Sequence, residues 1–83
     1  MAEFEKQDTS NKVITLIAEK LNVARDAVKL NSNLQDLGAD SLAMVEVIMK
    51  LEEDLDIQID DEKAEHLKSV EDVVDYVHSL RNK

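Results

Sequence analysis

The sequence predicts an all-α protein: a four-helix bundle with three longer helices, one short third helix and a long first loop. Apolar residues recur at helical spacing in three separate segments, whereas the one alternating stretch, 56–60, has no second strand candidate to pair with. The chain has 83 residues and no cysteine, which suits one small domain without disulfides. We expect a flexible N-terminal segment over residues 1–8 and a single domain over 9–81.

The first helix is predicted over about residues 9–22, with an apolar stripe of Val13, Leu16, Ile17 and Leu21. Three residues near its start have side chains that can cap a helix, namely Asp8, Thr9 and Ser10. Asn22 suits its C-terminal end. No period is sustained over 23–40, so we expect a long ordered loop held against the bundle by Val28, Leu30, Leu34 and Leu37.

The second helix is predicted over about 41–55, and it is apolar on more than one face. One stripe consists of Leu42, Val45, Ile48, Met49 and Leu55, and a second consists of Met44, Val47 and Leu51. A small bundle cannot bury both stripes, so some apolar side chains must stay at the surface near Ser41. We expect to find them among Leu42, Met44, Val45 and Met49.

The last third of the chain predicts one short and one long helix. Residues 56–60 form an extended connection in this interpretation, and Asp60 or Asp61 caps a short helix over about 61–66. Ser69 and Asp72 have the spacing of a capping box, with aspartate at the position usually taken by Glu or Gln. The final helix, about 70–80, has an apolar stripe of Val70, Val73, Val74, Val77 and Leu80.

The turn before the second helix joins the chain's only glycine, Gly38, to Ser41. Gly38 can take a left-handed backbone without steric cost, and Asp40 and Ser41 are both good N-cap residues. We therefore expect the Ser41 hydroxyl at a helix N-terminus, where unpaired N–H groups and the helix dipole stabilise an anion. A phosphate ester on Ser41 fits that environment.

The formal net charge of −9 is unevenly distributed. Ten acidic residues and only two lysines lie between Asp40 and Glu65, whereas the rest of the chain is nearly neutral. Such a surface repels phosphate backbones and anionic lipids and attracts basic protein patches. We therefore expect neither nucleic acid binding nor membrane insertion.

These features together resemble a known family. The run Gly38-Ala39-Asp40-Ser41-Leu42, followed by Val45-Glu46 and Leu51-Glu52-Glu53, is similar to the acyl carrier proteins of type II fatty acid synthesis. The resemblance extends from about Asp8 to Leu80. Two positions depart from the family pattern: Ala43 stands where a second aspartate is common, and Asp60 stands where many members have proline.

The resemblance implies a carrier without catalytic residues. A holo-acyl-carrier-protein synthase would attach a 4′-phosphopantetheine arm to Ser41, and the thiol of the arm would hold acyl chains as thioesters. Fatty acid synthesis enzymes and acyltransferases with basic docking patches would be the other partners. The matching docking positions are Asp40, Glu46, Glu52 and Glu53 for charge, and Leu42, Val45 and Met49 for apolar contact. We expect a monomer in the bacterial cytoplasm or an organelle matrix, because no signal peptide or membrane span is recognisable.

Three alternatives were weighed against this interpretation. A serine hydrolase is disfavoured because Ser41 lacks the nucleophile elbow, and neither His66 nor His78 lies in a recognisable triad. A specialised discrete carrier of aminoacyl, polyketide or unusual lipid groups is the alternative within carriers. The alternative outside carriers is an acidic or calcium-responsive interaction bundle.

Part of the acidic stretch resembles a calcium-binding loop. Asp54, Asp56 and Glu65 match three of its ligand positions, but Ile59 stands where that loop requires glycine. We therefore expect no metal site.

Overall fold

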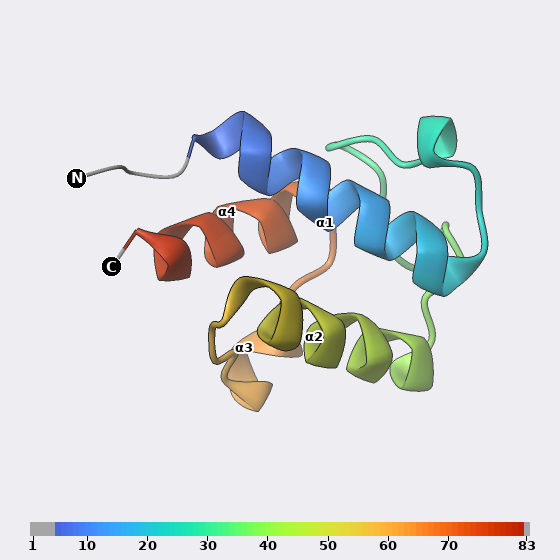
Figure 1. Ribbon diagram of the computed structural model, residues 1–83. Helices are drawn as coiled ribbons and strands as arrows, with labels where there is room; N and C mark the ends of the chain where they lie inside the picture. The colour runs from blue at the N-terminus through green and yellow to red at the C-terminus, as the bar shows by residue number, and fades with distance from the viewer. Residues whose placement is uncertain (1–4, 83) are drawn as a thin grey trace.

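The computed structural model describes residues 5–82, which form a helical bundle (Figure 1). Its elements in chain order are α1 (Lys6–Leu21), the 3-10 helix η1 (Arg25–Ala27), α2 (Ser41–Leu55), α3 (Asp61–Ala64) and α4 (Val70–Arg81). No strand occurs between residues 5 and 82, and the predicted bundle with a short third helix and a long first loop is confirmed. The predicted flexible segment 1–8 lies partly outside the described residues.

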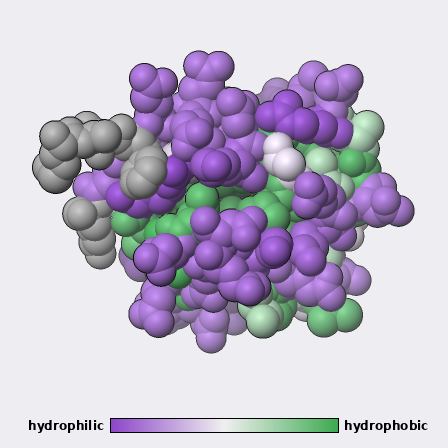
Figure 2. All heavy atoms as spheres, in the orientation of Figure 1, coloured by the Kyte–Doolittle hydropathy of each residue, from purple (hydrophilic) through white to green (hydrophobic). Residues whose placement is uncertain are grey.

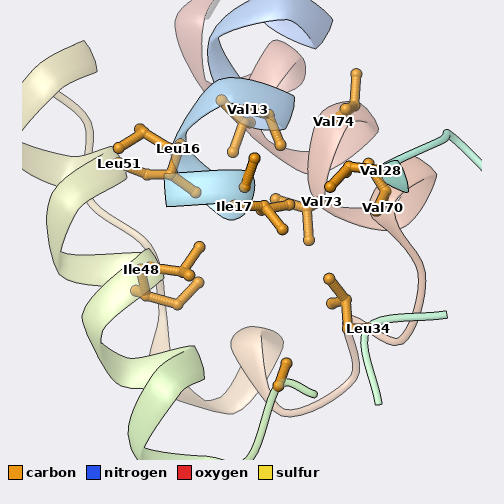
Figure 3. Close-up of a cluster of buried hydrophobic side chains, with 14 of the residues drawn as sticks. Val13, Leu16, Ile17, Val28, Leu34, Ile48, Leu51, Val70, Val73 and Val74 are labelled. Carbon is orange, nitrogen blue, oxygen red and sulfur yellow. The ribbon is translucent and has the colours of Figure 1, made fainter. Parts of the chain in front are cut away.

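α1 is the central helix, because it packs against both α2 and α4 (Figure 1). Side chains from these three helices and from the long loop converge on one aliphatic cluster (Figure 3). Its fully or almost fully buried members include Val13, Ile17, Val47, Leu51, Val70, Val73, Val74 and Val77. Burial of each such side chain contributes roughly 1.5–3 kcal/mol, so this cluster is the main source of stability.

The surface around this cluster is mostly hydrophilic. Figure 2 shows purple residues over nearly all of the visible face, with a band of hydrophobic residues across its middle, between α1 and α2. Hydrophobic spheres also reach the surface at the lower right, where Figure 1 places the start of α2. On this face, one exposed hydrophobic area therefore lies at the start of α2.

The start of α1 differs from the prediction. The helix begins at Lys6 with Glu5 as its N-cap, and none of the three predicted caps is used. Thr9 is fully buried, and its hydroxyl oxygen lies 2.9 Å from an Arg81 guanidinium nitrogen and 3.0 Å from Nδ1 of His78. The hydroxyl thus serves a tertiary contact with α4 instead of a cap, which a local sequence pattern cannot reveal.

The long loop is tied to α1 by polar side chains. Asn22 ends α1 in the left-handed region with φ of 57°, which confirms its predicted position. Arg25, in η1, donates hydrogen bonds to Thr15 at 3.0 Å and to Asn11 at 3.1 Å. No sequence pattern indicates η1, because its three residues are too few to show a period.

The second half of the loop is tied to the segment before α4. Val28 and Leu34 are buried in the core as predicted, whereas Leu30 keeps 41% of its surface exposed. The Leu34 N–H donates to the Lys68 carbonyl at 2.9 Å, and Asn33 and Ser69 form an isolated antiparallel bridge. These bonds order the loop although it lacks a helical period.

The last two helices follow the predicted caps. Asp60 accepts a hydrogen bond from the Glu62 N–H at 3.0 Å, but α3 ends at Ala64, two residues before the predicted end. The N–H groups of His66 and Leu67 bond three residues back instead of four, which is the geometry of a tightened last turn. The capping box of α4 is confirmed, since Ser69 and Asp72 accept hydrogen bonds from each other's N–H groups.

Candidate functional site

Ser41 is the first residue of α2, and its side chain is exposed. In the turn that precedes it, Gly38 has φ of 93°, the positive φ that the sequence predicts and that glycine adopts without strain. The Gly38 N–H donates to the Gln35 carbonyl and the Ala39 N–H to the Leu34 carbonyl, both at 3.0 Å. The turn therefore fixes the direction in which the chain enters α2.

Asp40 is the residue that caps α2. Its Oδ1 accepts a hydrogen bond from the Ala43 N–H at 2.8 Å, and its carbonyl oxygen accepts one from the Met44 N–H at 2.9 Å. The N–H groups of Ser41 and Leu42 have no acceptor among residues 5–82. An anion on the Ser41 hydroxyl oxygen would therefore meet two unpaired N–H groups and the positive end of the helix dipole.

The outer face of α2 exposes apolar side chains close to Ser41, as the sequence predicts. Leu42, Val45 and Met49 keep 68%, 53% and 56% of their surfaces exposed, and Met44 is partly buried. Ile48, which the sequence places in the same stripe, belongs to the core with 7% exposure. Three residues turn a helix by about 300°, so Ile48 lies about 60° from Val45 and on the inner side of α2.

The four carboxylates predicted for partner contact fall into two groups, according to whether they hold a hydrogen bond of the fold. Asp40 caps α2, and Glu52 accepts a hydrogen bond from the Ile59 N–H through Oε2 at 2.8 Å. Glu46 and Glu53 are exposed, and within the described part of the chain they have no hydrogen bond or ion pair. Glu46 and Glu53 are therefore available to a partner's cation, whereas Asp40 and Glu52 also support the fold.

A groove with a volume of about 850 Å³ runs beside α2, and Ser41 is among its lining residues. One wall is the side of α2 that carries Met44, Ile48 and Glu52. The facing wall consists of loop residues around Leu34, together with α3 and the residues that follow it. In Figure 3, Ile48 and Leu34 extend toward the core from α2 and from the loop. The groove thus combines apolar lining with an opening next to Ser41.

The far wall of the groove is the part of the site that the sequence did not reveal. The sequence predicts only loop packing for Leu34 and no role for Ala64, Leu67 or Lys68, yet all four line the groove. The available signal was the recurrence of leucines in the loop. It showed that the loop is ordered, but not that it faces the segment around α3.

The histidines are engaged elsewhere or exposed. Nδ1 of His78 contacts the Thr9 hydroxyl and its Nε2 lies 3.2 Å from the amide nitrogen of Asn82, while His66 is exposed. Within residues 5–82, no three His, Asp or Glu side chains are grouped so that they could hold a metal ion. No helix in the described part of the chain has the length and apolar character needed to cross a membrane.

The chain is similar to known proteins over most of its length. Residues 11–77 match the family described as the phosphopantetheine attachment site. The acyl carrier protein of Campylobacter jejuni subsp. doylei is 47% identical over 74 residues, which cover 88% of this chain and 96% of that protein. The acyl carrier protein of Clostridium perfringens is 50% identical over 68 residues, covering 81% and 90%.

Solved structures agree with these sequence relatives. The acyl carrier protein of Enterococcus faecalis superposes with a TM-score of 0.76 at 31% identity, covering 93% of this chain and 99% of that one. The acyl carrier protein of Thermotoga maritima gives a TM-score of 0.80 at 22% identity, with 96% and 94% covered, and so supports the fold.

The fold and the matched segment define a phosphopantetheine-binding carrier domain. Within that class, the chain belongs to the acyl carrier protein family. Its cofactor is 4′-phosphopantetheine, and its function is to carry acyl groups for fatty acid synthesis. The resemblance noted in the sequence is thereby confirmed.

Proposed function

We propose that Ser41 carries the 4′-phosphopantetheine arm through a phosphodiester on its hydroxyl oxygen. The observation that supports this is an exposed hydroxyl at the first residue of α2, beside two N–H groups without an acceptor. A holo-acyl-carrier-protein synthase transfers the arm from coenzyme A, with loss of the hydroxyl proton and departure of the nucleotide portion. The arm supplies the thiol that this cysteine-free chain lacks, and acyl chains are held on it as thioesters.

The outer face of α2 is the proposed docking surface for synthase, fatty acid synthesis enzymes and acyltransferases. It combines the exposed apolar residues Leu42, Val45 and Met49 with the exposed carboxylates Glu46 and Glu53. Basic patches on partners are attracted by the acidic residues, and the apolar side chains supply area that is buried on contact. Asp40 and Glu52 contribute charge to the same surface while they hold hydrogen bonds of the fold.

The groove beside α2 is the proposed place for an acyl chain when no partner is bound. It lies next to Ser41 and is lined on both sides by aliphatic side chains, among them Met44, Ile48, Leu34 and Leu67. Each methylene that moves from water into such a lining contributes about 0.8 kcal/mol. The chemistry of the thioester itself belongs to the partner enzymes, and the carrier is not a catalyst.

We assign the protein to the bacterial cytoplasm, or alternatively to an organelle matrix, as a monomer. The bacterial origin of the relatives named above supports the first location.

Intact-mass spectrometry after co-expression with a phosphopantetheinyl transferase tests the assignment of Ser41. The wild-type chain should gain the mass of one arm, and Ser41→Ala should keep its unmodified mass. Ser79→Ala is the matched control, because Ser79 is exposed on α4 and its loss should leave modification intact. An unmodified wild-type chain, under conditions that modify a known carrier, would contradict the proposal.

A further inference from the structure

The α3 wall of the groove is held at its two ends. Between residues 61 and 67, the backbone hydrogen bonds stay local, such as those from Ala64 to Asp60 and from Leu67 to Ala64. No side chain in this span forms a hydrogen bond or ion pair with another element among the described residues. Only partly buried apolar side chains, Ala64 and Leu67, hold the middle of the wall against the core.

The two ends have different anchors. At the C-terminal end, the Lys68 carbonyl accepts a hydrogen bond from the Leu34 N–H at 2.9 Å, and the Lys68 N–H donates to the Asp72 carboxylate of the α4 cap at 3.2 Å. At the N-terminal end, the Ile59 N–H donates to the Glu52 carboxylate at 2.8 Å, and the Asp60 N–H donates to the Tyr76 hydroxyl at 3.3 Å. The shorter and charged of these two side-chain anchors is Glu52.

Glu52 also faces the docking surface. It is half-buried, it lines the groove, and it lies about 20° from Val45 around the axis of α2. One carboxylate oxygen accepts from Ile59, and the other has no partner among residues 5–82. A guanidinium group binds a carboxylate most strongly through both oxygens, so a docking arginine competes with the Ile59 N–H for this side chain.

We propose that Glu52 is a positioning residue that latches the α3 wall over the groove, and that a partner's cationic side chain opens the latch by capturing its carboxylate. This inference rests on the proposed function, because it takes the groove as the site of the acyl chain. It couples docking to release: the chain stays covered in the free carrier and becomes accessible where an enzyme binds. Ile59 is only 6% exposed, so its N–H has little access to water as a substitute acceptor while the wall is closed.

Amide hydrogen exchange of Ile59 in the unmodified chain tests the latch directly. Glu52→Ala removes the acceptor and should speed exchange at Ile59 by about tenfold. Glu52→Gln keeps an acceptor oxygen without the charge, and its rate should stay within about twofold of wild type. Glu19→Ala is the matched control, since it removes an exposed carboxylate of α1, outside the docking surface, that accepts no such bond. Equal Ile59 exchange in wild type and Glu52→Ala would overturn the latch.

Release is tested on the octanoyl form of the same four proteins at low ionic strength, by the rate at which hydroxylamine cleaves the thioester. A tetra-arginine peptide should accelerate cleavage several-fold in wild type and in Glu19→Ala. Glu52→Ala should be fast without peptide, and Glu52→Gln should be slow and unresponsive to it. Equal acceleration of wild type and Glu52→Gln would show a general charge effect and overturn the release step. If no octanoyl form can be made on Ser41, the proposed function fails, whereas the Ile59 exchange still decides the latch.

Discussion

The two regions on either side of α1 differ in how completely their apolar side chains are buried. Toward α4, Val13 and Ile17 share a cluster with four valines of α4, and none of these six side chains keeps any exposed surface. Toward α2, three apolar side chains are more than half exposed, and a groove of about 850 Å³ opens between α2 and the α3 segment. Val47 and Leu51 of α2 are buried in the same core, so only the outer face of α2 and the groove present apolar surface for cargo and partners.

The two regions also differ in how many of their charged side chains are joined in ion pairs. Near the chain ends, α1 and α4 are joined by ion pairs between Lys6 and Asp75 and between Arg81 and Asp8, the latter at 3.1 Å. A hydrogen bond to Asp75 and the charge of that carboxylate raise the pKa of Lys6. Along α2, the only ion pair among the described residues joins Lys50 to Asp54 at 3.6 Å. The acidic charge of the α2 region is therefore left largely uncompensated, as a docking surface for cations requires.

Matched truncations on the two sides of α1 should show the largest difference. Ile17→Ala opens a cavity in the fully buried cluster and should lower the free energy of unfolding by about 2–5 kcal/mol. Met49→Ala should change it by less than about 0.5 kcal/mol, because the side chain is mostly exposed, yet it should slow acyl transfer to a partner enzyme. Urea unfolding measures the change in the free energy of unfolding, and the rate of acyl transfer to a partner enzyme measures the effect on docking. Similar losses of stability in the two variants would remove the distinction between the regions.

Occupation of the groove should stabilise the α2 region. An eight-carbon chain could gain up to roughly 5 kcal/mol from its buried methylenes. After the costs of ordering the chain and displacing the groove wall are subtracted, a net gain of about 1–2 kcal/mol should remain. The octanoyl form should then melt several degrees above the form with the bare arm. Ile48→Phe adds bulk to the groove lining and should shrink this difference. Equal melting midpoints of the octanoyl and bare-arm wild-type forms would show that the chain stays in solvent.

Charge reversal on α2 should slow association with a partner more than charge reversal on α1 and η1 does. Glu46→Lys combined with Glu53→Lys should slow association with a basic partner by about tenfold at low salt and by less at high salt. Glu19→Lys combined with Asp26→Lys makes the same change in net charge on exposed residues of α1 and η1. Stopped-flow association rates should respond to the first pair far more than to the second. Equal responses would mean that only total charge matters.

The smallest expected effect lies in the cap of α4. Hydrogen bonds from the N–H groups of Lys68 and Ser69 lower the pKa of Asp72 below its usual value. A carboxyl group with a lowered pKa in the fold stabilises it above its unfolded pKa of about 3.9, and this contribution disappears as pH falls through the folded pKa. Asp72→Asn should therefore lower the urea midpoint at neutral pH, with a gap to wild type that narrows below about pH 3.9. A constant gap down to strongly acidic pH would contradict this assignment.

The parts of the fold that the sequence predicts well depend on short local sequence patterns. The limits of α2, the turn at Gly38 and the capping box of Ser69 and Asp72 each depend on residues within a few positions of one another. Their side chains can satisfy nearby N–H groups without reference to the rest of the chain. The same holds for Ser41, whose position follows from the cap that precedes it.

The parts that escaped prediction depend on distant partners. Thr9 appeared to be a cap, but its hydroxyl is used by Arg81, 72 residues later. Glu52 appeared to be a surface acid, but it holds the Ile59 N–H. Periodicity also could not decide which members of one α2 stripe face inward, because Val45 and Ile48 are both apolar and only packing in the core separates them.

The contact between Thr9 and Arg81 has a geometric consequence for linking this domain to other chains. It brings the first turn of α1 and the last turn of α4 to one end of the molecule, while α2 starts at the opposite end (Figure 1). A linker joined before α1 or after α4 would therefore hold the domain by the end farthest from Ser41. Such a tether would leave Ser41 facing outward, where the proposed arm could reach partner enzymes.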